Sequence, residues 1–360
     1  MTDRIDRLRK ATAGLGADAA IITHSANRRY FSGFPDVDHA PDESSGFLLV
    51  TNQDAVLYTS PTNIPWAEGS VRAPVTATPW EQPWPTFLGE LLQQSGVKRA
   101  AFEDRAMIVA DHTTLTAATG GVALLPAGNA VHLVRARKDE EELAAISRAA
   151  SITDAAFLAA TANLTPGVTE RELVWRIELA MRELGADGPG FPTIVASGPF
   201  GARPHHDPTD RPIAASEPIV IDMGAMVDGY CADLTRTICV GPPPAEFVAR
   251  YNTVLAAQNA ALAGIKPGMI GREADALARD ALIAAGEEDH IIHGLGHGVG
   301  LLIHEFPSLG KNSDDVLETG HVVTIEPGLY FEGWGGIRIE DLCVVTETGV
   351  DILSQAPKDK

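Results

Sequence analysis

The spacing of hydrophobic and polar residues predicts alternating helices and strands along the first third of the chain. Ile5, Leu8 and Leu15 recur at helical spacing, and an apolar run follows at 19–22. The runs GFLLVT (46–51) and AVLYT (55–59) are typical of strands, and the short polar turn between them predicts a hairpin. Similar signals continue to about Val131, which indicates a small α/β domain.

A stretch rich in Pro and Trp lies at 61–85 and contains Trp66, Trp80 and Trp84. Loops of this length are often either functional or packed, and we expect an ordered surface loop with its aromatic side chains packed beneath it. The alternative is a rim that contacts the substrate or a neighbouring subunit.

A domain boundary is predicted near residues 135–138, which separates a domain at 1–134 from a larger one at 135–360. Just beyond the boundary, KDEEELAAISRAASITDAAFLAA has the composition of a long helix. Its acidic first turn suits the positive end of a helix dipole.

The larger domain repeats itself. The segments PGVTERE (166–172) and PGMIGRE (267–273) each lie between two helical patterns, and strand-like runs follow each of them. Two such units predict a duplicated α/β fold with a pseudo-two-fold relation between its halves. A site at the junction would take ligands from both halves.

Composition narrows the function classes. The net charge is −20, from 48 acidic and 28 basic residues, which disfavours binding to nucleic acid or to an anionic membrane. The charged start and the lack of an apolar run of about 18 residues indicate neither a secretory leader nor a membrane span. The 3 cysteines form no disulfide framework or CxxC pair. A cytoplasmic enzyme or binding protein is expected.

Carboxylates occupy positions where apolar residues are expected. Asp222 ends the strand-like run PIVID, and Asp233 lies beyond a turn that could bring the two together. Glu326 and Glu340 interrupt the apolar runs VVTIEPG and GIRIEDL. A single buried carboxylate is usually structural, but several in one duplicated domain predict a bound cation.

The segment HGLGHGVGLLIHE (293–305) supplies imidazoles for such a site. A phosphate-binding loop is disfavoured because no GK[ST] follows, and the HExxH zinc motif is absent. One imidazole among carboxylates is a hard, oxygen-rich set that favours Mn²⁺ or Co²⁺, with Fe²⁺ or Zn²⁺ as alternatives. Two ions about 3.5–4 Å apart would share bridging carboxylates and acidify a water toward hydroxide. Five other histidines are expected to be structural: His24, His39, His112, His132 and His290.

These motifs resemble those of the pita-bread metallopeptidases. IDMGAMVDGYCADLTRT, HGLGHGVGLLIHE, TIEPGLY and GIRIED follow the family's order of Asp, Asp, His, Glu and Glu over about 139–354. NRRYFSGF (27–34) resembles part of the creatinase/prolidase N-terminal domain, which favours the proline-specific branch over methionine aminopeptidase. The resemblance implies hydrolysis of the bond between an N-terminal residue and proline.

The resemblance also implies metal-binding roles. Asp222 would bind one ion, His297 and Glu326 the other, and Asp233 and Glu340 would bridge them. Glu326 would also shuttle a proton from the bridging water to the leaving nitrogen.

Other residues would hold the substrate. His304 would donate to the scissile carbonyl oxygen, and His205, rather than its neighbour His206, would contact the proline side. His293 would line the pocket, and Arg338 would orient carboxylates. Tyr330 would be either a site residue or a packing aromatic.

Several alternatives remain open. Prolidases commonly place an Arg between the positions of His304 and Glu326 to hold a dipeptide's carboxylate, whereas 305–325 contains only Lys311. This favours an Xaa-Pro aminopeptidase over an Xaa-Pro dipeptidase. A metal-free creatinase-like hydrolase and a non-catalytic binding protein are disfavoured by the intact ligand set. The resemblance also implies a homodimer.

Overall fold

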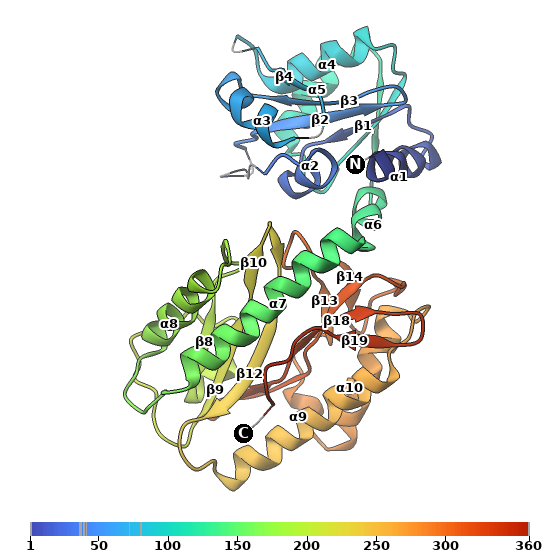
Figure 1. Ribbon diagram of the computed structural model, residues 1–360. Helices are drawn as coiled ribbons and strands as arrows, with labels where there is room; N and C mark the ends of the chain where they lie inside the picture. The colour runs from blue at the N-terminus through green and yellow to red at the C-terminus, as the bar shows by residue number, and fades with distance from the viewer. Residues whose placement is uncertain are drawn as a thin grey trace. The chain divides into compact units, whose positions relative to one another are not determined.

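The computed structural model describes residues 2–35, 38, 40, 42–71, 73–79 and 81–358, so His39 and Trp80 lie outside the described residues. The chain divides into two compact units, Met1–Arg135 and Ala136–Lys360. Figure 1 shows the first unit in blue to cyan and the second in green to red.

The first unit is built on a six-stranded sheet with the order β4-β3-β2-β1-β5-β6. The predicted hairpin is confirmed, because β2 and β3 pair antiparallel with Gly46 opposite Thr59. The predicted first helix is present, but Leu15 lies beyond its end and is exposed. The strands are β1 (Ala19–Ile22), β2 (Gly46–Thr51), β3 (Ala55–Thr59), β4 (Val75–Ala77), β5 (Arg99–Phe102) and β6 (Ala123–Pro126). The helices are α1 (Thr2–Gly14), α2 (Ser25–Ser32), α3 (Ile64–Ser70), α4 (Trp84–Gln94), α5 (Val109–Ala118) and α6 (Ala130–Ala136).

The interpretation of 61–85 as a loop is wrong. This stretch contains the 3₁₀ turn Pro61–Asn63, helix α3, strand β4 and the start of α4. Pro61, Pro65 and Pro85 stand in the first turn of these helices, where a missing N–H costs no hydrogen bond. Trp84 packs on the core with its ring 5.6 Å from that of Phe47, whereas Trp66 is half exposed.

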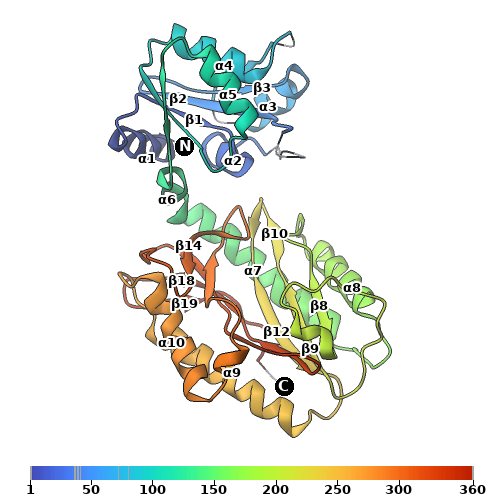
Figure 2. The same cartoon turned by 180° about the vertical axis from the view of Figure 1, so that it is seen from behind.

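The second unit consists of two similar halves. Each half presents a pair of helices against strands: α7 and α8 contact β8 and β10, while α9 and α10 contact β14–β17 (Figures 1 and 2). The helices are α7 (Glu140–Thr161), α8 (Glu170–Glu183), α9 (Ala245–Gly264) and α10 (Gly271–Ala284). The first half's strands are β7 (Gly188–Pro189), β8 (Ile194–Ser197), β9 (Pro218–Met223), β10 (Ala225–Val227), β11 (Tyr230–Cys231) and β12 (Leu234–Cys239). The second half's strands are β13 (Gly296–Gly298), β14 (Glu305–Leu309), β15 (Val322–Ile325), β16 (Gly328–Phe331), β17 (Gly335–Arg338), β18 (Asp341–Val345) and β19 (Val350–Ile352).

The duplication extends to individual hydrogen bonds. Gly167 and Gly268 take the same place in the two halves, with φ of 98° and 89°, a left-handed conformation that favours glycine. Gly167 N donates to Ile213 O, and Gly268 N donates to Leu317 O. Each half has its own apolar core, one around α7 and α8 and one around α9 and α10. The predicted duplicated α/β fold is therefore confirmed.

Helix α7 begins at a capping box in which Asp139 and Glu142 satisfy each other's backbone N–H groups. By length and composition alone it could cross a membrane, with a mean hydropathy of 1.3 over its most apolar window. Half of that window is buried, and the helix packs against α8, β10 and β11. These contacts are those of a core helix.

Candidate metal centre

Strand pairing brings the predicted ligands to the junction of the two halves. Asp222 lies near the end of β9 opposite Thr235 of β12, and Asp233 immediately precedes β12. Glu326 follows β15, and Glu340 precedes β18, which pairs with β15. Glu340 N donates to Thr235 O across the seam at 3.0 Å, so ligands from both halves face one another.

Three of the predicted ligands form a compact group. Asp233, His297 and Glu340 offer ligand atoms that all lie within 4.8 Å of one another. Glu326 adjoins this group, because its Oε1 lies 3.2 Å from His297 Nε2. Asp233 Oδ2 lies 3.7 Å from the same nitrogen.

Asp222 is the fifth predicted ligand, and its two oxygens differ. Oδ2 accepts from Arg338 Nη2 at 2.6 Å. Oδ1 is buried and has no hydrogen-bond partner within the described part of the chain. A buried oxygen of this kind suits a cation, and the donor set as a whole matches a hard divalent ion.

Burial and the charges of neighbouring groups together set the pKa values of the carboxylates in the cluster. Burial, then the carboxylates of Glu340 and Asp222, raise the pKa of Asp233 well above its usual range. Burial, followed by Glu326 and Asp222, does the same to the pKa of Glu340. Burial opposes ionisation of Glu326 as well, but the hydrogen bond and charge of His297 lower its pKa to about 2. A bound cation would offset this repulsion.

A chain of polar contacts supports the centre from one side. Arg338 donates from Nη1 to Tyr330 Oη at 2.9 Å and from Nε to Thr235 Oγ1 at 3.0 Å. Tyr330 Oη also lies 2.8 Å from His293 Nε2. Burial raises the pKa of Tyr330 to about 12 and lowers the pKa of His293. Arg338 and Tyr330 are themselves buried, so Arg338 forms no surface ion pair and Tyr330 belongs to a polar network.

The histidines beyond His297 differ in exposure. His304 is exposed, and its ring centroid lies 4.3 Å from that of His297 at an interplanar angle of 84°. Partial desolvation of the ring, followed by the charge of His297, lowers the pKa of His304. His206 is buried, lies 3.0 Å from Glu170 and packs on Phe200, whereas its neighbour His205 is exposed.

Two threonines in the site were missed from the sequence. Thr235 Oγ1 donates to Glu340 Oε2 at 2.6 Å. Thr324 Oγ1 donates to Glu326 Oε1 at 3.0 Å and accepts from His297 N. Thr235 lies two residues after Asp233, and Thr324 lies two residues before Glu326. The period of two in a strand, which puts such pairs on one face, was the available signal.

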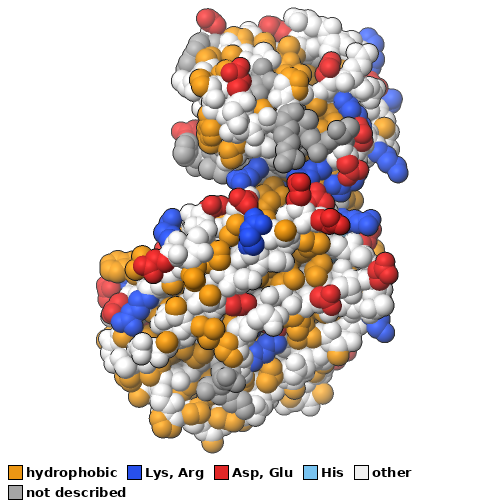
Figure 3. All heavy atoms as spheres, viewed as in Figure 1, with side chains coloured by type: hydrophobic (Ala, Val, Ile, Leu, Met, Phe, Trp, Pro, Cys, Tyr) orange, Lys and Arg blue, Asp and Glu red, His pale blue; other side chains and the backbone are white. Residues whose placement is uncertain are grey.

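Contacts within the fold support a structural role for several of the histidines expected to be structural. His24 caps α2, His112 packs on Phe102, and His290 packs on Phe331. On the face in Figure 3, Lys and Arg side chains are scattered among Asp and Glu rather than gathered in a stripe. That nucleic acid is not a partner stays a prediction.

Comparison with known proteins identifies the family. Residues 144–347 match Metallopeptidase family M24, and residues 4–137 match the Creatinase/Prolidase N-terminal domain. The chain is 33% identical to the Xaa-Pro dipeptidase of Pyrococcus furiosus over 100% of its length and 99% of the relative's.

Solved structures show the same fold over nearly the whole chain. An Xaa-Pro dipeptidase from Bacillus anthracis superposes with a TM-score of 0.93 at 34% identity, covering 99% of this chain and 98% of that one. An X-Pro aminopeptidase from Thermotoga maritima gives 0.90 at 32% identity, with coverages of 99% and 98%. Family M24 peptidases use divalent metal ions. The chain therefore belongs to metallopeptidase family M24, with a creatinase/prolidase N-terminal domain followed by a pita-bread domain.

Proposed function

We propose that this chain is a two-metal exopeptidase that cleaves the bond between an N-terminal residue and a following proline. The observation that carries the proposal is the meeting of Asp222, Asp233, His297, Glu326 and Glu340 at the seam of the two halves. Relatives over the full chain length are named Xaa-Pro dipeptidases and an X-Pro aminopeptidase, which supports the same substrate class.

The five residues would hold the ions, with Asp233 and Glu340 shared between them. Mn²⁺ is the proposed ion and Co²⁺ the nearest alternative, because hard oxygen donors outnumber the single imidazole. Fe²⁺ and Zn²⁺ remain further alternatives. When bound, such ions would lower the pKa of a water at the centre and polarise the scissile carbonyl.

The side chains of the protein would handle the proton and the substrate. Glu326 is ionised, since its pKa is about 2, and can therefore accept a proton and return it to the leaving nitrogen. The lowered pKa of His304 keeps its imidazole neutral near pH 7, so one nitrogen can donate a hydrogen bond to the carbonyl oxygen. His205 and His293 would contact the substrate, His205 on its proline side. This arrangement suits a tertiary amide that offers no N–H to the enzyme.

The length of the substrate is the open choice within this proposal. The stretch 305–325 has no Arg, and its one Lys, Lys311, is exposed. This favours an aminopeptidase that acts on longer peptides, as the name of the Thermotoga maritima structure does. The names of the Pyrococcus furiosus and Bacillus anthracis relatives favour the second candidate, an Xaa-Pro dipeptidase.

The test compares an Xaa-Pro dipeptide with an Xaa-Pro-Yaa tripeptide under added Mn²⁺ or Co²⁺, with a chelator control. Preferred turnover of the tripeptide supports the aminopeptidase, and turnover of the dipeptide alone supports the dipeptidase. Inactivity on both would overturn the proline assignment. Activity that survives chelation in a protein shown by elemental analysis to hold no metal would overturn the metal mechanism in favour of a creatinase-like hydrolase.

A homodimer and a cytoplasmic location stay predictions. Light scattering coupled to gel filtration would measure the first directly, and cell fractionation the second.

A further inference from the structure

Behind the metal centre lies a buried arginine whose hydrogen-bonding capacity is fully used. Arg236 of β12 is only 1% exposed. Its Nη1 donates to Thr235 O at 3.0 Å and to Glu340 O at 2.5 Å. Nη2 donates to Asp341 Oδ1 at 2.8 Å and to Ala356 O at 2.8 Å, and Nε is shared between Ala356 O and Pro357 O. All five N–H groups of a guanidinium are thereby satisfied.

The position of Arg236 relative to the centre follows from strand geometry. Successive side chains in a strand point to opposite faces. Thr235 points toward the site and donates to the Glu340 carboxylate, so Arg236 points to the opposite face. Likewise Glu340 faces the site while its neighbour Asp341 pairs with Arg236. The ion pair therefore lies directly behind the two residues that meet across the seam.

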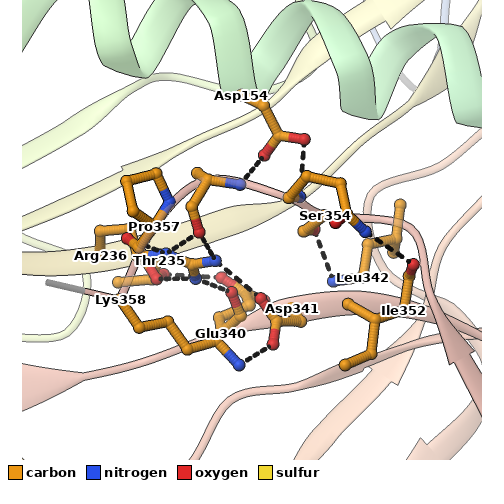
Figure 4. A network of polar contacts seen from close by, with 12 residues as sticks. Asp154, Thr235, Arg236, Glu340, Asp341, Leu342, Ile352, Ser354, Pro357 and Lys358 are labelled. Carbon is orange, nitrogen blue, oxygen red and sulfur yellow. Dashed lines mark hydrogen bonds and ion pairs between the residues drawn. The ribbon is translucent and has the colours of Figure 1, made fainter.

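The segment 353–358 also contacts Arg236, and Figure 4 shows this segment between α7 and the strands that carry Arg236 and Asp341. Its backbone N–H groups at Gln355 and Ala356 donate to the Asp154 carboxylate of α7 at 2.7 and 2.8 Å. Leu342 N donates to Ser354 Oγ at 3.0 Å. Lys358 pairs with Asp341, on the oxygen that also accepts from Gln258 of α9. The segment thus joins elements of both halves behind the metal centre.

We propose that Arg236, together with Asp341 and the segment 353–358, positions Glu340 and Thr235 for metal binding. Arg236 contacts the backbone of both residues, so it fixes the separation of β12 from the chain at 340. The two halves contribute different ligands, and a shift between these strands would move Glu340 away from Asp233. Support behind a ligand typically changes metal affinity about 10- to 100-fold. Arg236 is a positioning residue, and the proposal rests on the proposed metal-binding function.

The experiment measures Mn²⁺ binding to the full chain by calorimetry after chelation and dialysis, with unfolding followed in parallel. Arg236→Lys keeps the charge but loses the planar fork that reaches five acceptors. Asp341→Asn keeps the shape and removes the ion pair, so it serves if the arginine variant fails to fold. A third variant lacks residues from 354 onward. We expect each folded variant to bind Mn²⁺ about 10- to 100-fold more weakly. Saturating Mn²⁺ should restore most of kcat.

The matched control is Arg28→Lys in the first unit, where Arg28 is likewise buried and pairs with Asp38. It should lower stability and leave Mn²⁺ affinity unchanged. Variants of Arg236 and Asp341 that lose stability to the same extent but bind Mn²⁺ as the wild type does would overturn the positioning role. A wild type that binds Mn²⁺ but cleaves no Xaa-Pro peptide would refute the substrate proposal alone. A wild type that binds no divalent ion would refute both.

Discussion

Glu170 and the carboxylates of the metal centre all lie in the second unit, but their hydrogen-bonding surroundings differ. Glu170 is fully buried, and both its oxygens are surrounded by donors. Oε1 accepts from the N and Oγ of Ser197, while Oε2 accepts from the N and Oγ1 of Thr209 and lies 3.0 Å from His206. In the metal centre, by contrast, Asp222 Oδ1 has no partner in the described residues, and the charges of Glu340, Asp222 and Glu326 act on Asp233.

The pKa values of Glu170 and Asp233 shift in opposite directions for this reason. Burial alone would raise the pKa of Glu170, but hydrogen bonds from His206, Ser197 and Thr209 lower it. Burial and neighbouring carboxylates raise the pKa of Asp233 instead. A carboxylate surrounded by donors holds structure together, whereas a cluster poor in donors is suited to a cation. Burial alone therefore does not distinguish a structural carboxylate from a ligand.

The strongest test of this difference between structural and metal-binding carboxylates is to remove a carboxylate that both ions would share. Asp233→Ala and Glu340→Ala should each lose bound metal and reduce activity by more than about 100-fold, the upper range for residues that only support a ligand. Elemental analysis of the purified variants and peptide turnover would measure the two effects. Glu170→Gln should retain its full metal content in the same analysis. Retention of both ions by Asp233→Ala would contradict the shared-ligand assignment.

His304 sharpens the comparison because it lies beside the cluster without being a predicted ligand. His304→Ala should lower kcat by about 10²- to 10³-fold, the usual effect of losing one oxyanion donor. Its metal content should stay at the wild-type value, since the side chain is exposed and is not among the five predicted ligands. Steady-state kinetics on an Xaa-Pro-Yaa peptide would test this. A loss of metal with unchanged kcat per bound ion would make His304 a ligand instead.

The duplication and the ligand set could be predicted from sequence because each produces a recognisable pattern within a short segment. The repeated Pro-Gly segments that begin at 166 and 267 predict equivalent turns in the two halves. Asp222 and Glu326 stand out because they interrupt apolar runs. The residues that support those carboxylates produce no such pattern in the sequence. Thr235 fits an ordinary strand, and Arg236 reads as a surface charge until pairing shows acceptors from residues about 100 positions away. The helices within 61–85 are hard to predict from its prolines, because proline both breaks a helix and begins one.

Thr235 tests how much the few donors within the cluster contribute. Thr235→Val keeps the shape but removes the hydroxyl that donates to Glu340 and accepts from Arg338. We expect Mn²⁺ affinity to fall about 10- to 100-fold. Thr235→Ser, which keeps the hydroxyl, should stay near the wild-type affinity. Equal loss in both variants would assign the effect to packing rather than to the hydrogen bond.

Substitution of Glu170 should have the smallest effect on activity and the clearest pH-dependent effect on the free energy of unfolding. Its folded-state pKa lies below the ordinary value of 4.5, so its stabilising contribution is complete above that value and is lost as the pH falls through the lowered pKa. Glu170→Gln should therefore reduce the free energy of unfolding by about 1–3 kcal/mol at pH 7, since buried donors lose their acceptor. The difference between wild type and variant should shrink as the pH falls below 4.5.

Denaturant unfolding of the metal-free proteins at several pH values would measure this difference without the contribution of metal binding. Arg148→Gln is the control, because Arg148 and Asp228 form an exposed pair whose loss should change stability by less than about 1 kcal/mol. A Glu170→Gln deficit that stayed constant from pH 7 to below 4.5 would show that the carboxylate charge contributes nothing. The proposed difference between Glu170 and the metal-centre carboxylates would then be supported only by the metal content of the Asp233 and Glu340 variants.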